Sequence, residues 1–78
     1  MSSSVRAYVF LSTEKARVED IATAIRSLPY VRSADVITGQ FDVIVLVEAP
    51  ELGMLWTIVD KAQSVPGVTK TTTNLVVE

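Results

Sequence analysis

The chain has 78 residues and a formal net charge of −2, and it contains neither cysteine nor histidine. This length allows one domain, residues 1–78, and the missing residue types exclude disulfides, thiolate metal sites and the usual imidazole general base. A domain this small has a marginal hydrophobic core, so a partner subunit is the expected source of additional stability.

The N-terminal part of the chain predicts a strand followed by a helix. Residues 5–11 are rich in β-branched and aromatic side chains, a composition typical of strands. Ser12 and Thr13 then offer hydroxyls that could cap a helix. Pro29 ends this helix, because the residue before a proline is disfavoured in the helical region. The helix has one apolar stripe at helical spacing, made of Val18, Ile21, Ala22, Ile25 and Leu28.

The middle of the chain predicts a β-hairpin. Residues 31–38 and 41–48 both have extended character, and the short link between them contains Gly39, which can supply the positive φ that such a turn needs. Because side chains alternate along a strand, two apolar sets are expected on opposite faces of the second strand. These are Phe41, Val43, Val45 and Val47 on one face, and Ile44 and Leu46 on the other.

A second helix and a final strand complete the chain. Pro50 suits the first turn of a helix, and the segment 65–67, which contains a proline and a glycine, ends that helix. Residues 68–77 then predict the last strand. The expected apolar face of the second helix consists of Leu52, Leu55, Trp56, Val59 and Ala62.

The predicted elements follow the order β-α-β-β-α-β. Two split β-α-β units in this order form an α+β, ferredoxin-like sandwich, in which both helices cover one face of a four-stranded antiparallel sheet. The other face would normally be polar, yet the first and third strands carry apolar side chains on both faces. Such a surface indicates an interaction site, and a second copy packed face to face covers it most simply. Alternatively, the polar last strand could shield part of that face.

Two segments carry a resemblance to a known family. Residues 36–42 contain a Gly-x-x-Asp hairpin, and residues 66–73 form a proline-glycine turn followed by a threonine-rich strand. With this element order over residues 5–78, the chain resembles the ligand-binding domain of the Lrp/AsnC regulators, also called the RAM domain. The resemblance implies an amino acid effector domain that dimerises through its sheets. It also implies further assembly into an octamer-like or decamer-like ring, with the ligand between dimers near the hairpin.

The resemblance has one departure. Full-length members of the family carry a helix-turn-helix DNA-binding domain, whereas only four residues precede the first predicted strand here. The chain therefore resembles a stand-alone form of the domain, which would regulate by association with full-length regulators. Scattered basic residues and the negative charge also argue against direct DNA binding. No apolar run could span a bilayer and no secretion signal is evident, so we expect a soluble, cytoplasmic protein.

The Gly-x-x-Asp hairpin supplies most of the candidate ligand-binding residues. From the residues alone, Asp42 is more simply a side chain that caps the turn. The resemblance instead implies that Asp42 receives the ammonium group of an amino acid while nearby backbone amides face its carboxylate. Threonine hydroxyls on the last strand could also face a polar ligand, although threonine is a common strand residue. The full candidate set is Gly39, Gln40, Phe41, Asp42, Thr71, Thr72 and Thr73.

Three other functions compete with this one. Catalysis is disfavoured because acid–base chemistry would lack histidine, cysteine and a tight carboxylate pair, so we expect no catalytic residue, metal or cofactor. An ACT-like regulatory module shares the element order and binds amino acids, but it places its ligand-linked glycine between the first strand and first helix. Residues 12–15 contain no glycine at that point. A pure assembly module without a ligand is the remaining alternative.

Overall fold

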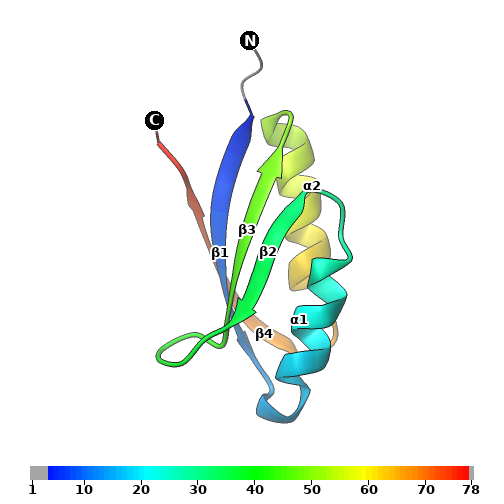
Figure 1. Cartoon of the computed structure of the whole chain (residues 1–78), viewed down its shortest axis with the longest axis vertical. Helices are drawn as coiled ribbons and strands as arrows, with labels where there is room; N and C mark the ends of the chain where they lie inside the picture. Colours follow the sequence, from blue (N-terminus) through cyan, green and yellow to red (C-terminus); the bar gives the residue numbers. More distant parts are fainter. Residues whose placement is uncertain (1–3, 78) are drawn as a thin grey trace.

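The computed structural model describes residues 4–77, in which two helices cover one face of a four-stranded antiparallel sheet (Figure 1). The strand order is β2-β3-β1-β4, so each helix connects two strands with a third strand between them. The predicted ferredoxin-like fold is confirmed. The elements are β1 (Val5–Thr13), the 3-10 turn η1 (Lys15–Arg17), α1 (Val18–Arg26), β2 (Val31–Val36), β3 (Val43–Ala49), α2 (Leu52–Gln63) and β4 (Val68–Leu75).

The hydrophobic core lies between the sheet and the helices. Side chains along β1 and β3 alternate between buried and more exposed, because successive residues of a strand face opposite sides. The buried set packs against Ile21 and Ile25 of α1 and against Leu55 and Ile58 of α2. Its strand members include Ala7, Val9, Leu11, Val43, Val45 and Val47.

The buried stripe of α2 differs from the predicted one. Trp56 and Leu52, which the sequence places on the apolar face, are 44% and 46% exposed, so this part of the prediction was wrong. Ile58 is buried instead, and with Leu55, Val59 and Ala62 it forms a narrower stripe at helical spacing. The helix is rotated so that Trp56 lies at the margin of the core.

Two strand ends also differ from expectation, namely the start of β3 and the end of β1. Phe41 precedes β3, and its ring centroid lies 5.3 Å from that of Phe10, whose side chain faces away from the helices. The prediction that Phe41 shares a face with Val43 was therefore wrong, because regular alternation begins only where β3 begins. Ser12 and Thr13 end β1 and cap neither η1 nor α1.

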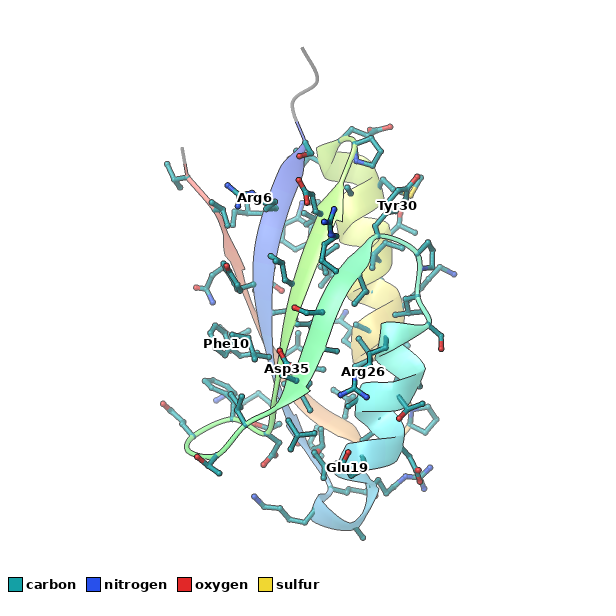
Figure 2. The ribbon with its side chains drawn as sticks, in the orientation of Figure 1. Arg6, Phe10, Glu19, Arg26, Tyr30 and Asp35 are labelled. Atoms are coloured by element: carbon teal, nitrogen blue, oxygen red, sulfur yellow. The ribbon has the colours of Figure 1, made fainter. Side chains whose placement is uncertain are left out.

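The sheet face opposite the helices is uncovered in the described chain. Strand register places Ile44 beside Phe10 and Leu46 beside Tyr8 on this face. Tyr8 is 40% exposed, and Figure 2 shows Phe10 projecting away from the helices. We call Tyr8, Phe10, Phe41, Ile44 and Leu46 the open-face patch.

The outer edge of β2 is partly closed by a side chain of α1. The Arg26 Nε–H donates a hydrogen bond of 2.8 Å to the backbone carbonyl of Ala34, and Arg26 lies between α1 and β2 in Figure 2. Because β2 is an outer strand, its free edge could otherwise bind a further strand.

The turn between α2 and β4 gives the first test of the fold. Gly67 has φ of 100°, and a Cβ there would lie 2.8 Å from Cδ1 of Ile21. Gly67→Ala should lower the free energy of unfolding by about 2–4 kcal/mol, because backbone strain and overpacking add. Gly39→Ala is the matched control, since Gly39 has φ of 114° but no atom within 4 Å of such a Cβ. Its cost should be about 1–2 kcal/mol. Urea titration measures both losses, and equal losses would contradict the packing of Gly67 against α1.

Candidate functional site

The Gly39–Asp42 turn links β2 to β3 at one end of the sheet and projects away from the helices (Figure 1). The Ile37 N–H donates to the carbonyl of Asp42 at 2.9 Å and closes the turn. Gly39 has the positive φ that the sequence predicts for it, at 114°. Gln40 is exposed, so the tip of the turn presents backbone and polar atoms to the outside.

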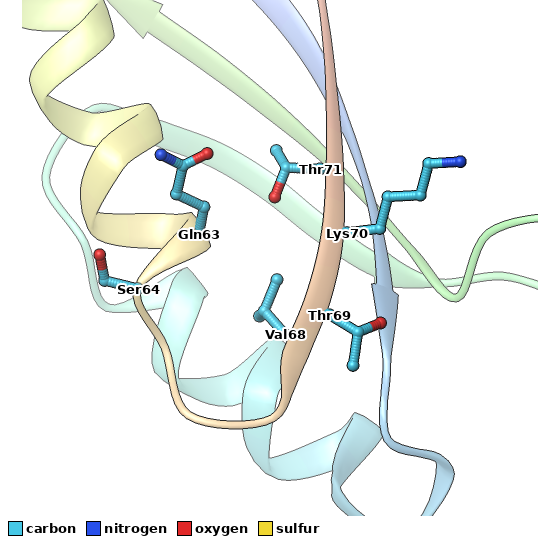
Figure 3. A pocket seen from close by; sticks show the side chains of 6 residues that line it. All are labelled: Gln63, Ser64, Val68, Thr69, Lys70 and Thr71. Atoms are coloured by element: carbon cyan, nitrogen blue, oxygen red, sulfur yellow. The ribbon is translucent and has the colours of Figure 1, made fainter.

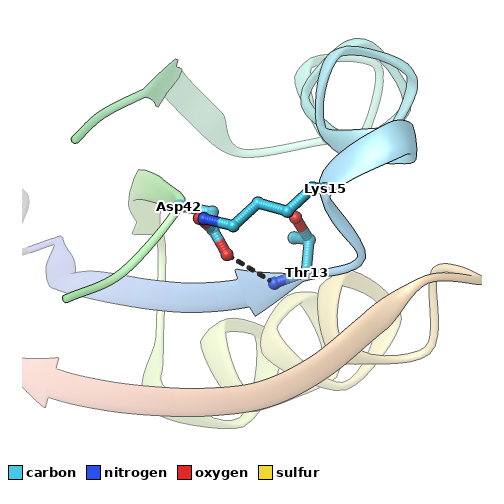
Figure 4. Close-up of polar contacts among 3 residues, drawn as sticks. All are labelled: Thr13, Lys15 and Asp42. Carbon is cyan, nitrogen blue, oxygen red and sulfur yellow. Dashed lines mark hydrogen bonds and ion pairs between the residues drawn. The ribbon is translucent and has the colours of Figure 1, made fainter. Parts of the chain in front are cut away.

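Asp42 fastens this turn to the end of β1. Its backbone N–H donates to the carbonyl of Leu11 at 2.8 Å. Oδ2 of its carboxylate accepts a hydrogen bond of 2.8 Å from the Thr13 N–H. Oδ1 forms an ion pair with Nζ of Lys15 at 2.9 Å (Figure 4). The side chain of Asp42 is 15% exposed and that of Lys15 is 85% exposed. The carboxylate is thus held by the backbone at Oδ2, whereas Oδ1 contacts only an exposed lysine side chain and can be reached from solvent.

These contacts favour the charged form of the carboxylate. The hydrogen bond from the Thr13 N–H, followed by that from the Lys15 ammonium, holds the pKa of Asp42 below its ordinary value of 3.8. Partial burial acts in the opposite direction but is the weaker effect. Asp42 is therefore ionised at neutral pH. An ionised carboxylate has about four lone-pair sites, so two hydrogen bonds leave acceptor capacity unused.

Sequence reasoning missed Thr13 and Lys15 as partners of Asp42. They lie 29 and 27 residues away from it, and no local pattern marks a contact over that separation. Thr13 is 8% exposed, and its hydroxyl Oγ1 has no hydrogen-bond partner among the described residues. The end of β1 therefore holds an unsatisfied polar atom in the same residue that anchors Asp42.

The threonines of β4 do not converge on the turn. Thr71 and Thr73 pair with Leu11 and Val9 on the helix side of the sheet, whereas Thr72 pairs with Phe10 on the open face. Thr71 lines a hollow of about 440 Å³ between the end of α2 and β4 (Figure 3). The other lining residues are Gln63, Ser64, Val68, Thr69 and Lys70. The candidate residues thus lie at three places, namely the turn, the hollow and the open face.

The described residues, 4–77, contain neither a cluster of metal-ligating side chains nor a helix able to cross a membrane. No group of three or more acidic side chains in this range could hold a metal ion. No helix in the described part of the chain has the length and apolar character needed to cross a membrane.

Comparison with known proteins places the chain in a family. Residues 6–78 match the model of the Lrp/AsnC ligand binding domain. The chain belongs to this family. The resemblance seen in the hairpin and in the threonine-rich strand is therefore confirmed. A search of curated proteins gives no match.

Solved structures share the fold. The TTHA0845 protein of Thermus thermophilus is 29% identical, with a TM-score of 0.89 over 95% of this chain and 94% of that one. The hypothetical protein PHS023 of Pyrococcus horikoshii is 27% identical, with a TM-score of 0.85 over 95% of this chain and 90% of that one. The transcriptional regulator NMB0573 of Neisseria meningitidis, solved as an L-Met complex, is 25% identical. Its TM-score is 0.81, and the match covers 95% of this chain and 50% of the regulator. This Lrp/AsnC domain thus spans half of a regulator and nearly all of two smaller proteins.

The lowered pKa of Asp42 predicts a pH dependence of stability. Above its ordinary pKa of 3.8, the ionised carboxylate is stabilised by Thr13 and Lys15, and this stabilisation is lost as the pH falls through the lowered pKa. The difference in unfolding free energy between wild type and Asp42→Asn should therefore be constant above about pH 5 and shrink below pH 3.8. Urea titrations of both proteins from about pH 7 to about pH 2.5 measure it. A difference that grows on acidification would contradict these contacts.

Proposed function

We propose that this Lrp/AsnC domain binds an amino acid effector at the Gly39–Asp42 turn and acts as the oligomerisation domain of a regulator. The observation that carries the proposal is the anchored carboxylate of Asp42 with the Lys15 ammonium 2.9 Å away. A free amino acid carries one ammonium and one carboxylate, so this pair offers the complementary charges. The L-Met complex of the Neisseria meningitidis relative is consistent with such a ligand.

The geometry suggests how the pair could open onto a ligand. Lys15 is held only at its tip and is mostly exposed, so its side chain can leave Asp42 at little cost. The ligand ammonium would then bind Oδ1 of Asp42, and Lys15 would turn to the ligand carboxylate. The Thr13 N–H keeps the carboxylate in place throughout, because it binds the other oxygen. Backbone N–H groups of Gly39, Gln40 and Phe41 are the further donors that we assign to the ligand carboxylate.

A second subunit would complete this site. An ion pair open to water binds weakly, whereas a ligand pocket normally removes most of the ligand surface from solvent. Within one chain, the hydroxyls of Thr71, Thr72 and Thr73 lie across β1 from Asp42. We therefore assign Thr72, on the open face, to the ligand from a neighbouring subunit; Thr71 and Thr73 face the helix side and could contact it only from there. A ligand held between subunits would report its presence through assembly.

We also propose that assembly begins with a homodimer formed by the open-face patch and continues to an octamer-like or decamer-like ring. Apolar side chains gathered on one sheet face favour burial against a like surface. The domain itself is not expected to read DNA, because both helices of residues 4–77 pack on the sheet and the charge is −2. Association with DNA-binding regulators of the same family would then connect effector binding to transcription. A cytoplasmic location stays a prediction.

Calorimetry with the common amino acids tests the effector site. Asp42→Asn keeps an oxygen that can accept from the Thr13 N–H, so the fold should survive. Loss of the charge should weaken binding about thirtyfold or more, since one charged partner of a desolvated site contributes about 2–5 kcal/mol.

The matched control is Asp20→Asn, which removes the same charge from an exposed position on α1 and should bind as wild type does. If no amino acid binds the wild-type protein, the domain is an assembly module without a ligand. If Asp42→Asn binds as tightly as wild type, Asp42 serves only the turn.

Ile44→Lys tests the dimer. Ile44 lies within the open-face patch, so a charge there should dissociate the dimer and lower the melting temperature of a domain with a marginal core. Thr23→Lys adds the same charge on the exposed face of α1 and should leave both properties unchanged. Light scattering at micromolar concentration and thermal melting give the readouts. A folded wild-type monomer would contradict the proposal.

A further inference from the structure

We infer that the outer face of α2 is a docking surface for an arginine-bearing segment of a partner protein. The arginine would stack on the indole ring of Trp56, between the carboxylates of Glu51 and Asp60. This surface is separate from the sites proposed above. It lies on the helix side of the sheet, and α2 begins at the end of the molecule opposite the Gly39–Asp42 turn (Figure 1).

Two large apolar side chains of α2 remain outside the core. Leu52 is 46% exposed and Trp56 is 44% exposed, and the two stand one helical turn apart. Side chains of a helix lean toward the preceding turn, so the Trp56 ring lies over the turn that contains Leu52 and Gly53. Nearly half of the surface of each of these two residues is therefore open to another molecule.

Gly53 adjoins this apolar pair, and the fold does not explain it. Glycine is less favourable than alanine inside a helix, and the glycines with positive φ are Gly39 and Gly67. Packing does not require a glycine either. Apart from atoms of its chain neighbours and of the α2 backbone, only Oε1 of Glu51 lies within 4 Å of a Cβ at Gly53, at 3.3 Å. A partner lying beside Trp56, in contrast, would need the space that a side chain here would fill.

Two carboxylates border Trp56 without a cationic partner in the described chain. Oε1 of Glu51 lies beside Gly53, which is a neighbour of Trp56 on the helix surface. Asp60 stands one turn beyond Trp56, and its Oδ1 accepts a hydrogen bond from the Gln63 amide at 3.0 Å. Both acids are exposed, and neither forms a salt bridge with a described residue. The exposed indole is thus bracketed by two acids along about 14 Å of helix.

These charges identify the occupant of the surface. The face of an indole ring attracts a cation, and a guanidinium suits it best, because it stacks flat on the ring while its edge donates to carboxylates. A neutral apolar segment would leave Glu51 and Asp60 beside a desolvated contact without a partner, and an acidic segment would be repelled. Leu52 adds a second requirement, since it offers a contact for an apolar side chain about 6 Å from the arginine.

Fluorescence provides a direct test, because Trp56 is the only tryptophan of the chain. The probe is a short alanine-based helical peptide with an arginine and a leucine one turn apart. It should change the Trp56 emission and protect the ring from acrylamide quenching, with a dissociation constant of about 1 mM or lower. The matched control peptide has citrulline in place of arginine, which keeps the shape without the charge.

The citrulline peptide should bind about fivefold more weakly than the arginine peptide, because it loses both the stacked cation and the two carboxylate contacts. No change in Trp56 fluorescence with the arginine peptide up to about 5 mM overturns the inference. Equal binding of the two peptides overturns it as well, since the charge would then play no part.

Variants of the two acids test the charge complementarity while Trp56 remains as the reporter. Glu51→Gln and Asp60→Asn should each weaken binding of the arginine peptide about threefold, and the double variant about tenfold. Glu19→Gln is the matched control, because it removes an exposed carboxylate from α1 and should bind as wild type does. Acid variants of α2 that bind as tightly as Glu19→Gln would show that these carboxylates recognise no cation.

Gly53→Ala separates recognition from folding. Alanine favours the helix, and the only close contact is the end of the flexible Glu51 side chain, so the urea midpoint should rise. Peptide binding should nevertheless fall about threefold or more, because the added methyl group occupies the space beside Trp56. A lower midpoint would show that the fold requires Gly53, and unchanged binding would show that the partner does not.

Trp56→Leu distinguishes a partner protein from a second copy of the chain. Leucine keeps an apolar side chain but lacks the aromatic face, so calorimetry should find the arginine and citrulline peptides binding within about twofold of each other. The mass measured by light scattering should stay that of wild type. A change in this mass would assign the face to self-association and overturn the inference.

Discussion

The one-sided cover of the sheet is the constraint on which the rest of this structure depends. Two helices bury Val9, Val45 and their neighbours completely, but they reach only one face of four strands. The other face carries Tyr8, Phe10 and Ile44, which no element of residues 4–77 covers. Both helices of residues 4–77 lie on the same face, so the described chain forms two layers. In the proposed dimer, covering this face and forming the assembly would be the same physical event.

In the proposed effector site, the side chain of Asp42 would serve both structure and recognition. Capping and ligand binding at first look like competing roles for this carboxylate. The geometry separates them, because Oδ2 is committed to the Thr13 N–H while Oδ1 holds only an exposed lysine. The buried contact fixes where the charge stands, and the exposed contact leaves that charge available for exchange. A site of this kind needs no rearrangement of the sheet to accept a ligand.

Much of the fold could be predicted from the sequence because it depends on periodic patterns. The alternation of apolar residues in β3 and the apolar stripe of α1 predict these two elements and most of the residues that they bury. The errors arose where a pattern meets a boundary. Trp56 fits an apolar stripe by spacing, but the rotation of α2 is set by its contacts with the sheet, which favour Ile58. Phe41 fits alternation by counting, yet it precedes the point at which β3 becomes regular.

Only part of the candidate site could be predicted from the sequence. Gly39 and Asp42 stand out locally, because a turn demands glycine and an acid often caps one. Thr13 and Lys15 do not, since their role exists only when β1 lies against the turn. The same holds for the spread of the β4 threonines over two faces, which follows from strand register and not from their sequence.

The contact between Arg26 and the carbonyl of Ala34 has a consequence for solubility. An exposed strand edge can recruit further chains into an open-ended ribbon, and β2 forms one outer edge of this sheet. With its carbonyl already bonded and a guanidinium lying along it, this edge offers a poor template for another strand. This contact would therefore favour closed assemblies over open-ended ribbons.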